Sequence, residues 1–230
     1  MGVEIIQMNE NTWRFEDMGV RFFLLTGKEK ALLSDSGMTT KKVRELVEPL
    51  TSLPLYLANT HSDRDHVAGN AEFSCFYMHP DEEEHYRQEG GEGEILPLRE
   101  GDELDLGERV LRVIEIPGHT PGSIGFLDVK VRVFISGDPI QEEGRIFMFG
   151  AHRNMPRYVE SLTALLARTS EFDEIWPSHA KIPVSPAILP ELIASAKKIL
   201  GGECEGHLEE FHGTKIMVYP LSPSTFLCDA

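Results

Sequence analysis

Two histidines and two aspartates lie within six residues of one another in the segment 59–69, which reads NTHSDRDHVAG. An extended loop projects alternate residues to the same side, so His61, Asp63 and Asp65 can converge, with His66 beside them. Imidazole and carboxylate groups are the side chains that bind transition metals. Four such groups at this density predict a metal site, although a simpler explanation is that Asp63 or Asp65 caps a following helix.

Three more residues of the same chemical types stand in equivalent places along the chain. The apolar run 53–58 before the loop predicts a buried strand. His119, Asp138 and His179 each follow a predicted strand and a turn in the same way. Loops at strand ends carry functional residues because the sheet holds them rigidly. Ligands from four strand ends at one rim therefore predict a metal centre built on a sheet.

The elements that must position these residues are short. Runs of β-formers between turn residues predict strands, and apolar residues at helical spacing predict four helices. The expected strands are 3–8, 12–16, 20–26, 30–34, 53–58, 73–78, 103–106, 109–116, 124–128, 131–135, one beginning at 174, 215–219 and 225–228. The expected helices are 39–50, 81–88, 155–168 and 186–200, and the segments 89–94 and 142–153 are expected to be irregular.

Composition predicts a single globular domain spanning residues 1–230. The contents of hydrophobic residues (41%) and charged residues (26%) are ordinary for a globular protein. A chain of this length buries roughly 70% of its unfolded surface. The formal net charge is −16, from 22 basic and 38 acidic residues. This charge argues against a nucleic-acid partner and against attraction to an anionic membrane surface.

Cysteine usage and the N-terminal residues both predict a cytoplasmic protein. Cys75, Cys204 and Cys228 are odd in number and widely spaced. They predict neither a disulfide framework nor a zinc knuckle, and each is expected to be a small buried residue in a reducing compartment. The first residues lack the basic and apolar regions of a signal peptide, and no apolar run approaches a membrane span.

Four motifs, in this order, resemble those of the metallo-β-lactamase superfamily. They are the loop at 60–69, GHTPGS at 118–123, SGD at 136–138 and SHA at 178–180. The resemblance covers nearly the whole chain. It implies an α/β fold, namely a four-layer αβ/βα sandwich with the metal site at the edge between two mixed β-sheets. The two halves of that single domain are expected to meet near residue 120.

The resemblance also implies two divalent metal ions that share one ligand. The metal could be zinc, iron or manganese. Carried over by position, the ligands are His61, Asp63 and His119 for the first ion, Asp65, His66 and His179 for the second, and Asp138 for both.

Asp63 departs from the family pattern, which has a histidine at this place. A carboxylate is a harder ligand than imidazole and shifts preference from zinc towards iron or manganese. Two divalent ions (+4) with the carboxylates Asp63, Asp65 and Asp138 (−3) give +1, one unit less than with histidine at position 63. Bound water should then be acidified less. A different metal, a weaker first site or a lost one all stay open, although the related flavodiiron proteins bind two irons with a glutamate there.

The implied activity is metal-assisted hydrolysis of a small-molecule ester, thioester, lactone, amide or phosphoester. The metals would activate a water and polarise the substrate, and Asp65 would orient that water as the catalytic residue. Two alternatives stay open. One is a non-haem iron oxidoreductase on the same fold, which Asp63 favours, and the other is a non-catalytic member that only binds a ligand. A homodimer is implied by the family alone.

Residues close to the expected rim are candidates for contact with the substrate. They are Phe147, Phe149, His152, Tyr158 and Lys181. Simple packing explains the two phenylalanines equally well, and His152 could be an ordinary surface residue. Arg153 could also meet a substrate carboxylate, and Arg64 could neutralise Asp63 or a substrate anion. His85 is expected to be exposed to solvent.

Overall fold

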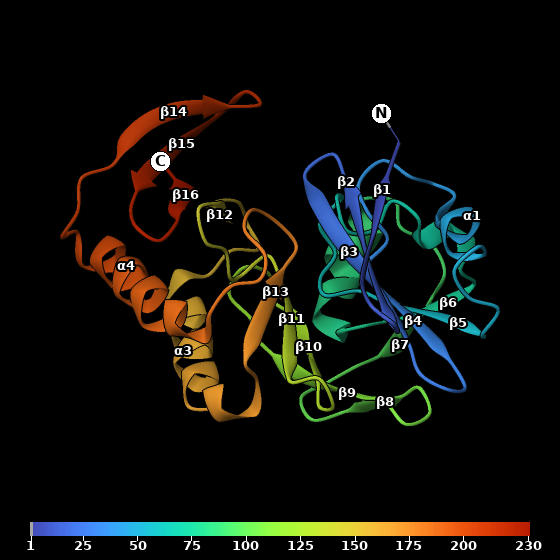
Figure 1. Ribbon diagram of the computed structural model, residues 1–230. Helices are drawn as coiled ribbons and strands as arrows, with labels where there is room; N and C mark the ends of the chain where they lie inside the picture. The colour runs from blue at the N-terminus through green and yellow to red at the C-terminus, as the bar shows by residue number, and fades with distance from the viewer. Residues whose placement is uncertain (1) are drawn as a thin grey trace.

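The computed structural model describes residues 2–230, which contain three β-sheets (Figure 1). The first sheet keeps its seven strands in sequence order. Its first four strands form an antiparallel meander, and the next three run parallel to the fourth. The strands are β1 (Glu4–Asn9), β2 (Thr12–Asp17), β3 (Val20–Thr26), β4 (Ala31–Ser34), β5 (Leu55–Ala58), β6 (Cys75–Met78) and β7 (Glu94–Pro97).

The other two sheets come from the remainder of the chain. The second has the order β13-β11-β10-β9-β8, and the third has the order β12-β16-β15-β14. The strands of the second sheet are β8 (Glu103–Asp105), β9 (Val110–Glu115), β10 (Ile124–Asp128), β11 (Val133–Gly137) and β13 (Glu174–Pro177). Those of the third are β12 (Arg145–Met148), β14 (His207–Phe211), β15 (Thr214–Pro220) and β16 (Thr225–Asp229).

Four α-helices cover the outer faces of the first two sheets, with α3 and α4 on one side and α1 on the other (Figure 1). They are α1 (Val43–Val47), α2 (Glu83–Gln88), α3 (Met155–Leu166) and α4 (Leu189–Gly201). The start of α3 is set by Asn154, whose side chain accepts a hydrogen bond from the Arg157 amide, with Pro156 in the first turn. Within residues 2–230, no helix combines the length and the apolar character that crossing a membrane requires.

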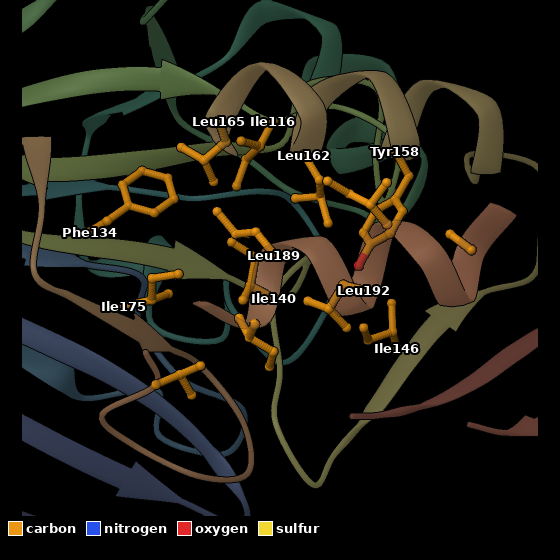
Figure 2. Close-up of a cluster of buried hydrophobic side chains, with 14 of the residues drawn as sticks. Ile116, Phe134, Ile140, Ile146, Tyr158, Leu162, Leu165, Ile175, Leu189 and Leu192 are labelled. Carbon is orange, nitrogen blue, oxygen red and sulfur yellow. The ribbon is translucent and has the colours of Figure 1, made fainter. Parts of the chain in front are cut away.

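The apolar side chains separate into layers. Phe23 of β3 and Phe126 of β10 belong to a cluster with members from both sheets, while Leu24 of β3 faces the other way, into a cluster with Val43 of α1. A third cluster packs the second sheet against α3 and α4, with residues such as Leu162 at its centre (Figure 2). Because alternate strand residues feed opposite clusters, the order of layers is helix, sheet, sheet, helix. This confirms the predicted four-layer fold.

Several local expectations were wrong. The change of sheet falls between β7 and β8, not near residue 120, because β8 and β9 pair with β10 in the second sheet. The segments 89–94 and 142–153, expected to be irregular, contain the start of β7 and all of β12. The strand β14 was not expected, because its sequence is polar. In the structure it is almost fully exposed. Cys75 is exposed instead of buried.

A buried ion pair ties the first two sheets together. Arg109, directly before β9, donates from Nε to Asp128 Oδ2 at 2.6 Å. Its guanidinium also donates to Thr12 Oγ1 at 2.8 Å and to the Thr26 carbonyl at 3.2 Å, both in the first sheet. Arg109 and Asp128 are 5% and 1% exposed. The pair therefore has its donors satisfied by groups from both sheets, which is what makes a buried charge tolerable.

Removing Arg109 should destabilise the fold. We expect Arg109→Ala to lower the free energy of unfolding by about 3–5 kcal/mol, because the Asp128 carboxylate would stay buried without its counter-charge. Urea denaturation followed by circular dichroism measures this change. The matched control is Arg132→Ala, which removes an exposed ion pair with Asp173 and should change stability little. Equal effects in the two variants would contradict the role of the buried pair.

Candidate metal centre

The seven predicted ligands come together at the edge between the first two sheets, in two groups that share Asp138. His61 and His66 lie on the loop after β5, His119 between β9 and β10, Asp138 after β11 and His179 after β13. The first group is His61, Asp63, His119 and Asp138, and the second is Asp65, His66, Asp138 and His179. The loop aspartates do not cap a helix, since the short 3₁₀ turn that follows (Asn70–Glu72) has no side-chain cap.

The ligand atoms of the first group lie within 4.8 Å of one another, close enough to share one metal ion. Asp63 Oδ2 lies 3.5 Å from His61 Nε2 and 3.2 Å from His119 Nε2. Asp138 Oδ2 lies 3.9 Å and 3.6 Å from the same two nitrogens. Ligands about 2.0–2.1 Å from a tetrahedral zinc ion lie about 3.3–3.4 Å from one another. The first group therefore fits a metal ion.

The second group has similar spacing. Asp138 Oδ1 lies 3.0 Å from His66 Nε2 and 3.2 Å from His179 Nε2. Asp65 Oδ2 lies 3.6 Å and 3.2 Å from the same nitrogens. Buried polar atoms normally have hydrogen-bond partners. Nevertheless His61 Nε2, His66 Nε2, His119 Nε2 and Asp138 Oδ1 have none in the described chain. Metal coordination would satisfy these four atoms.

The other nitrogen of each histidine is held by the protein. Nδ1 of His119 contacts the Phe147 carbonyl at 2.9 Å, and Nδ1 of His179 contacts the Gly19 carbonyl at 2.8 Å. A carbonyl can only accept, so Nδ1 of these rings is the protonated donor. When such a ring is neutral, its lone pair is therefore on Nε2, which faces the centre. This is the tautomer that binds a metal.

Asp35 holds both histidines of the 59–69 loop. Its Oδ2 accepts hydrogen bonds from His66 Nδ1 at 2.9 Å and from the Thr60 hydroxyl at 2.8 Å. The Thr60 oxygen in turn lies 2.9 Å from His61 Nδ1. Asp35 is 1% exposed and has a φ of 65°, a conformation that costs energy in a residue other than glycine. Sequence analysis missed Asp35, although an aspartate directly after a buried strand was a usable signal.

A second buried carboxylate fixes the loop from the other side. Glu82 Oε2 accepts from the backbone N–H of Ser62 at 2.8 Å and from its hydroxyl at 2.6 Å. Glu82 Oε1 accepts from the Gly122 amide at 2.7 Å. Glu82 is fully buried. It therefore joins the loop that carries His61 to the turn that carries His119.

Two glycines are required by the crowding around the centre. Gly118 has a φ of +135°, and a Cβ there would lie 2.4 Å from the backbone of Tyr158. Gly137 has a φ of +62°, and a Cβ there would lie 2.8 Å from Thr60 Oγ1. Any other residue would displace α3 from the His119 turn, or Thr60 from Asp35.

Asp63 is neutralised by Arg153, not by Arg64. Arg153 Nη2 lies 2.6 Å from Asp63 Oδ2, and Nη1 donates to the His119 carbonyl at 2.7 Å. Arg64 instead extends outward and pairs with Glu89. The expectation that Arg64 neutralises Asp63 was therefore wrong, because the loop directs its side chain away from the centre. Arg153, offered as a contact for a substrate carboxylate, is already occupied by a protein carboxylate.

The charges of Asp63 and Arg153 shift the pKa values in the first group. Burial disfavours ionisation of Asp63, but the adjacent His119 and His61 rings and the charge of Arg153 hold the pKa of Asp63 well below its usual range. Burial and the nearby Arg153 lower the pKa of His119 despite the attraction of Asp63. Asp63 is therefore an anion and His119 a neutral ligand at physiological pH.

The second group is dominated by carboxylates. Burial disfavours charge on His66, yet Asp138, Asp65 and Asp35 hold the pKa of His66 well above its usual value. Burial acts the same way on His179, but Asp138 and Asp65 raise its pKa to about 10. A metal ion that binds here must displace these protons.

The two groups differ in their access to solvent. The side chains of His61 and His119 are 0% and 1% exposed, whereas those of Asp65 and His179 are 29% and 24% exposed. The centre is therefore open on the side of the second group. A cavity of about 350 Å³ also adjoins the His119 turn and is lined partly by His152 and Arg153.

The predicted substrate contacts are placed unevenly. His152 lines the cavity and packs against His85, with ring centroids 4.6 Å apart and ring planes tilted by 43°. His85 is half-buried, not exposed as expected, and its Nδ1 lies 2.9 Å from Ser62 Oγ. Tyr158 was wrongly predicted as a substrate contact. It is fully buried in the core and donates its hydroxyl to the Pro139 carbonyl (Figure 2).

The remaining candidates make contacts within the protein. Phe147 and Phe149 pack against each other and against Phe211. The backbone of Phe147, not its ring, serves the centre by accepting the His119 hydrogen bond. Lys181 is exposed and pairs with Glu142 at 2.6 Å. Substrate contact by these three side chains stays a prediction.

Comparison with known proteins identifies the family. The model of the metallo-beta-lactamase superfamily matches residues 17–179. The chain belongs to the metallo-beta-lactamase superfamily. Its fold is also that of a solved metallo-beta-lactamase from Pontibacter korlensis, with a TM-score of 0.73 at 14% identity over 85% of this chain and 99% of that one. The family predicted from the four motifs is confirmed.

The characterised relatives have different activities. A hydroxyacylglutathione hydrolase of Methylococcus capsulatus is 32% identical over 51% of this chain and 46% of its own length. The human acyl-coenzyme A thioesterase MBLAC2 is 23% identical over 72% of this chain and 75% of its own. The human mitochondrial persulfide dioxygenase ETHE1 is 26% identical over 56% and 52%, respectively. The chain spans about half the length of the hydroxyacylglutathione hydrolases it matches.

Asp138 should be needed by both groups. We expect Asp138→Ala to lose both metal ions, because its two oxygens face different groups. Elemental analysis of the purified variant measures the metal content per chain. Cys75→Ala, at an exposed position outside the centre, should keep the parent content. Unchanged stoichiometry in the Asp138 variant would contradict its assignment as the shared ligand.

Asp35 should control metal affinity without touching a metal. We expect Asp35→Asn to weaken binding by about 10–100-fold, as is typical when the group that orients a histidine ligand is lost. Titration of chelator-treated protein against a competing chromophoric chelator gives the affinity. Asp173→Asn makes the same change at an exposed carboxylate paired with Arg132 and should leave affinity unaltered. A similar affinity in both variants would show that Asp35 does not orient the ligands.

Proposed function

We propose that this protein is a metal-dependent hydrolase that uses two divalent ions to cleave small-molecule thioesters. The observation that carries the proposal is the pair of ligand groups that share Asp138, each with its nitrogen and oxygen atoms 3.0–3.9 Å apart. Four of these buried atoms have no other partner. This donor set suits zinc, iron or manganese.

Each ligand group has a distinct task in this proposal. His61, His119 and Asp63 would hold the first ion, and His66, His179 and Asp65 the second. Asp138 would contact both. Bound divalent ions supply a Lewis acid that acidifies water and polarises a carbonyl oxygen. The protein keeps the ligands in place through Nδ1 of the histidines and through the buried carboxylates Asp35 and Glu82.

Asp65 is the residue best placed to guide the attacking water. Its side chain is 29% exposed, the largest value among the seven ligands. One oxygen of Asp65 faces His66 and His179 of the second group. The Asp65 carboxylate therefore lies where that group meets solvent. An anionic acceptor at this position accepts a hydrogen bond from the water and orients its lone pair towards the substrate carbonyl.

A thioester is favoured among the predicted bond types by its leaving group. A thiol has a pKa of about 8.5, so a thiolate can depart without first receiving a proton, whereas an amide nitrogen needs an acid. The described residues around the centre offer carboxylates and histidines, while Lys181 is paired with Glu142 and the Tyr158 hydroxyl with the Pro139 carbonyl. Two relatives also support this class, since one is a hydroxyacylglutathione hydrolase and another an acyl-coenzyme A thioesterase.

Substrate preference tests the proposal. With the same acyl group, we expect kcat/KM for a glutathione or coenzyme A thioester to exceed that for the corresponding amide by roughly 10²–10⁴-fold, the usual contribution of a general acid. Release of thiol, or of amine, is measured with the metal-loaded protein. Asp65→Asn should lower kcat for the thioester, while Cys75→Ala should not. Absence of turnover with every thioester, ester, lactone and phosphoester tried would refute a hydrolase.

A non-haem iron oxidoreductase is the second candidate. Asp63 favours it, because a carboxylate in the first group is a harder ligand than histidine. The similarity to a persulfide dioxygenase also supports it. Elemental analysis separates the two functions in practice. Iron in the purified protein, together with oxygen consumption on a persulfide, would favour the oxidoreductase, whereas zinc or manganese with thioester turnover would favour the hydrolase.

A further inference from the structure

The carboxylate that replaces a histidine in the first group is paired with one cation. Arg153 Nη2 lies 2.6 Å from Asp63 Oδ2. The side chains of Asp63 and Arg153 are 16% and 12% exposed, so solvent screens the pair little. The oxygen that receives Arg153 is the same one that faces His61 and His119. The guanidinium therefore acts on the ligand atom itself.

The backbone holds Arg153 in this place. Arg153 directly precedes Asn154, the N-cap of α3. Nη1 of Arg153 donates to the His119 carbonyl at 2.7 Å, and the Asn154 amide donates to the Gly118 carbonyl at 2.8 Å. Further along α3, the Ser161 hydroxyl donates to the Pro117 carbonyl at 2.7 Å. The start of α3 and the His119 turn therefore form one unit, from which Arg153 reaches across to Asp63.

Charge counting shows what the pair does. Two divalent ions with Asp65 and Asp138 carry +2 when position 63 holds a neutral ligand. Asp63 reduces this sum to +1, and Arg153 returns it to +2. We propose that Arg153 is a positioning residue that makes the Asp63–Arg153 pair equivalent in charge to the single histidine of the family motif. This inference rests on the metal centre of the proposed function, but not on any substrate.

The pair also weakens Asp63 as an electron donor to a metal ion. One cation already shares the lone pairs of Oδ2, which reduces the electron density that the oxygen can give to a metal. Arg153 thus moves a hard, anionic ligand towards a neutral one. If Arg153 only braced α3, its loss would loosen the centre and lower metal affinity. If it offsets Asp63, removing its charge leaves an uncompensated carboxylate that attracts a cation more strongly.

A double-mutant cycle tests this difference. The proteins are the parent, Asp63→His, Arg153→Gln and the combination of both, each stripped with chelator and titrated with Zn²⁺ against a chromophoric competitor. Asp63→His alone should weaken zinc binding by roughly 10–100-fold, because Arg153 then faces two metal ions without its partner. Arg153→Gln alone should bind zinc as tightly as the parent or more tightly. The combined variant should return to within about threefold of the parent.

Two further variants serve as controls for the double-mutant cycle. Arg153→Lys keeps the charge and should show near-parental zinc affinity even if the loss of the planar donor pair lowers thermal stability. Arg157→Gln is the matched control, since Arg157 also lies at the start of α3 and lines the same cavity, but pairs with exposed Glu160. It should leave zinc affinity unchanged. Thermal melting of each variant confirms that it is folded before titration.

Two outcomes would overturn the inference. One is a combined variant that binds zinc as weakly as Asp63→His alone, which would show that removing Arg153 does not relieve the loss. The other is loss of a zinc equivalent in Arg153→Gln. These outcomes are separable from failure of the proposed function, because the titration uses no substrate. A protein that shows the predicted coupling and hydrolyses no thioester would refute the hydrolase and retain the role of Arg153.

Discussion

The hydrogen bond between Asp35 and His66 is the interaction on which the centre most depends. It links a strand end of the first sheet to the ligand loop, and through Thr60 it reaches His61 as well. One buried carboxylate therefore sets the orientation of two rings from different ligand groups. The strained backbone at Asp35 is consistent with this use, because strain is kept where the surroundings require it.

The rest of the architecture serves to bring separate strand ends to this place. β5, β11 and β13 each lead into a loop that carries a ligand. Gly118 and Gly137 allow α3 and Thr60 to approach these loops closely, and Glu82 joins two of the loops directly. The ion pair of Arg109 and Asp128 joins the two sheets between which the centre lies. Rigidity at each level limits how far any ligand can move.

The centre is asymmetric in a way that suits two tasks. The first group is enclosed and contains Asp63 with its counter-charge, Arg153. The second group is partly open and contains Asp65. An enclosed group is suited to holding a metal in a fixed electrostatic environment, and an open one to meeting water and substrate. The departure at position 63 thus lies in the group whose two histidines are almost fully buried.

The sequence by itself determined the kinds of ligand and the strand ends that carry them. An apolar run that ends at His61, Asp138 or His179 can be recognised from the sequence, because this pattern is contained in a single segment. The same local information failed for β12 and β14, which pair with β16 and β15 in the third sheet. It also failed for Tyr158, since nothing in its neighbourhood indicates that α3 turns this ring into the core.

Only the tertiary structure decided which charge meets which. Arg64 is adjacent to Asp63 in sequence, yet Arg153, 90 residues away, is its partner. Asp35 likewise reaches His66 across 31 residues. The physical reason is that pairing depends on distance and direction in space, and side-chain direction is set by the backbone of each loop. A sequence can place a cation near a carboxylate, but only packing of α3 on the His119 turn aims Arg153 at Asp63.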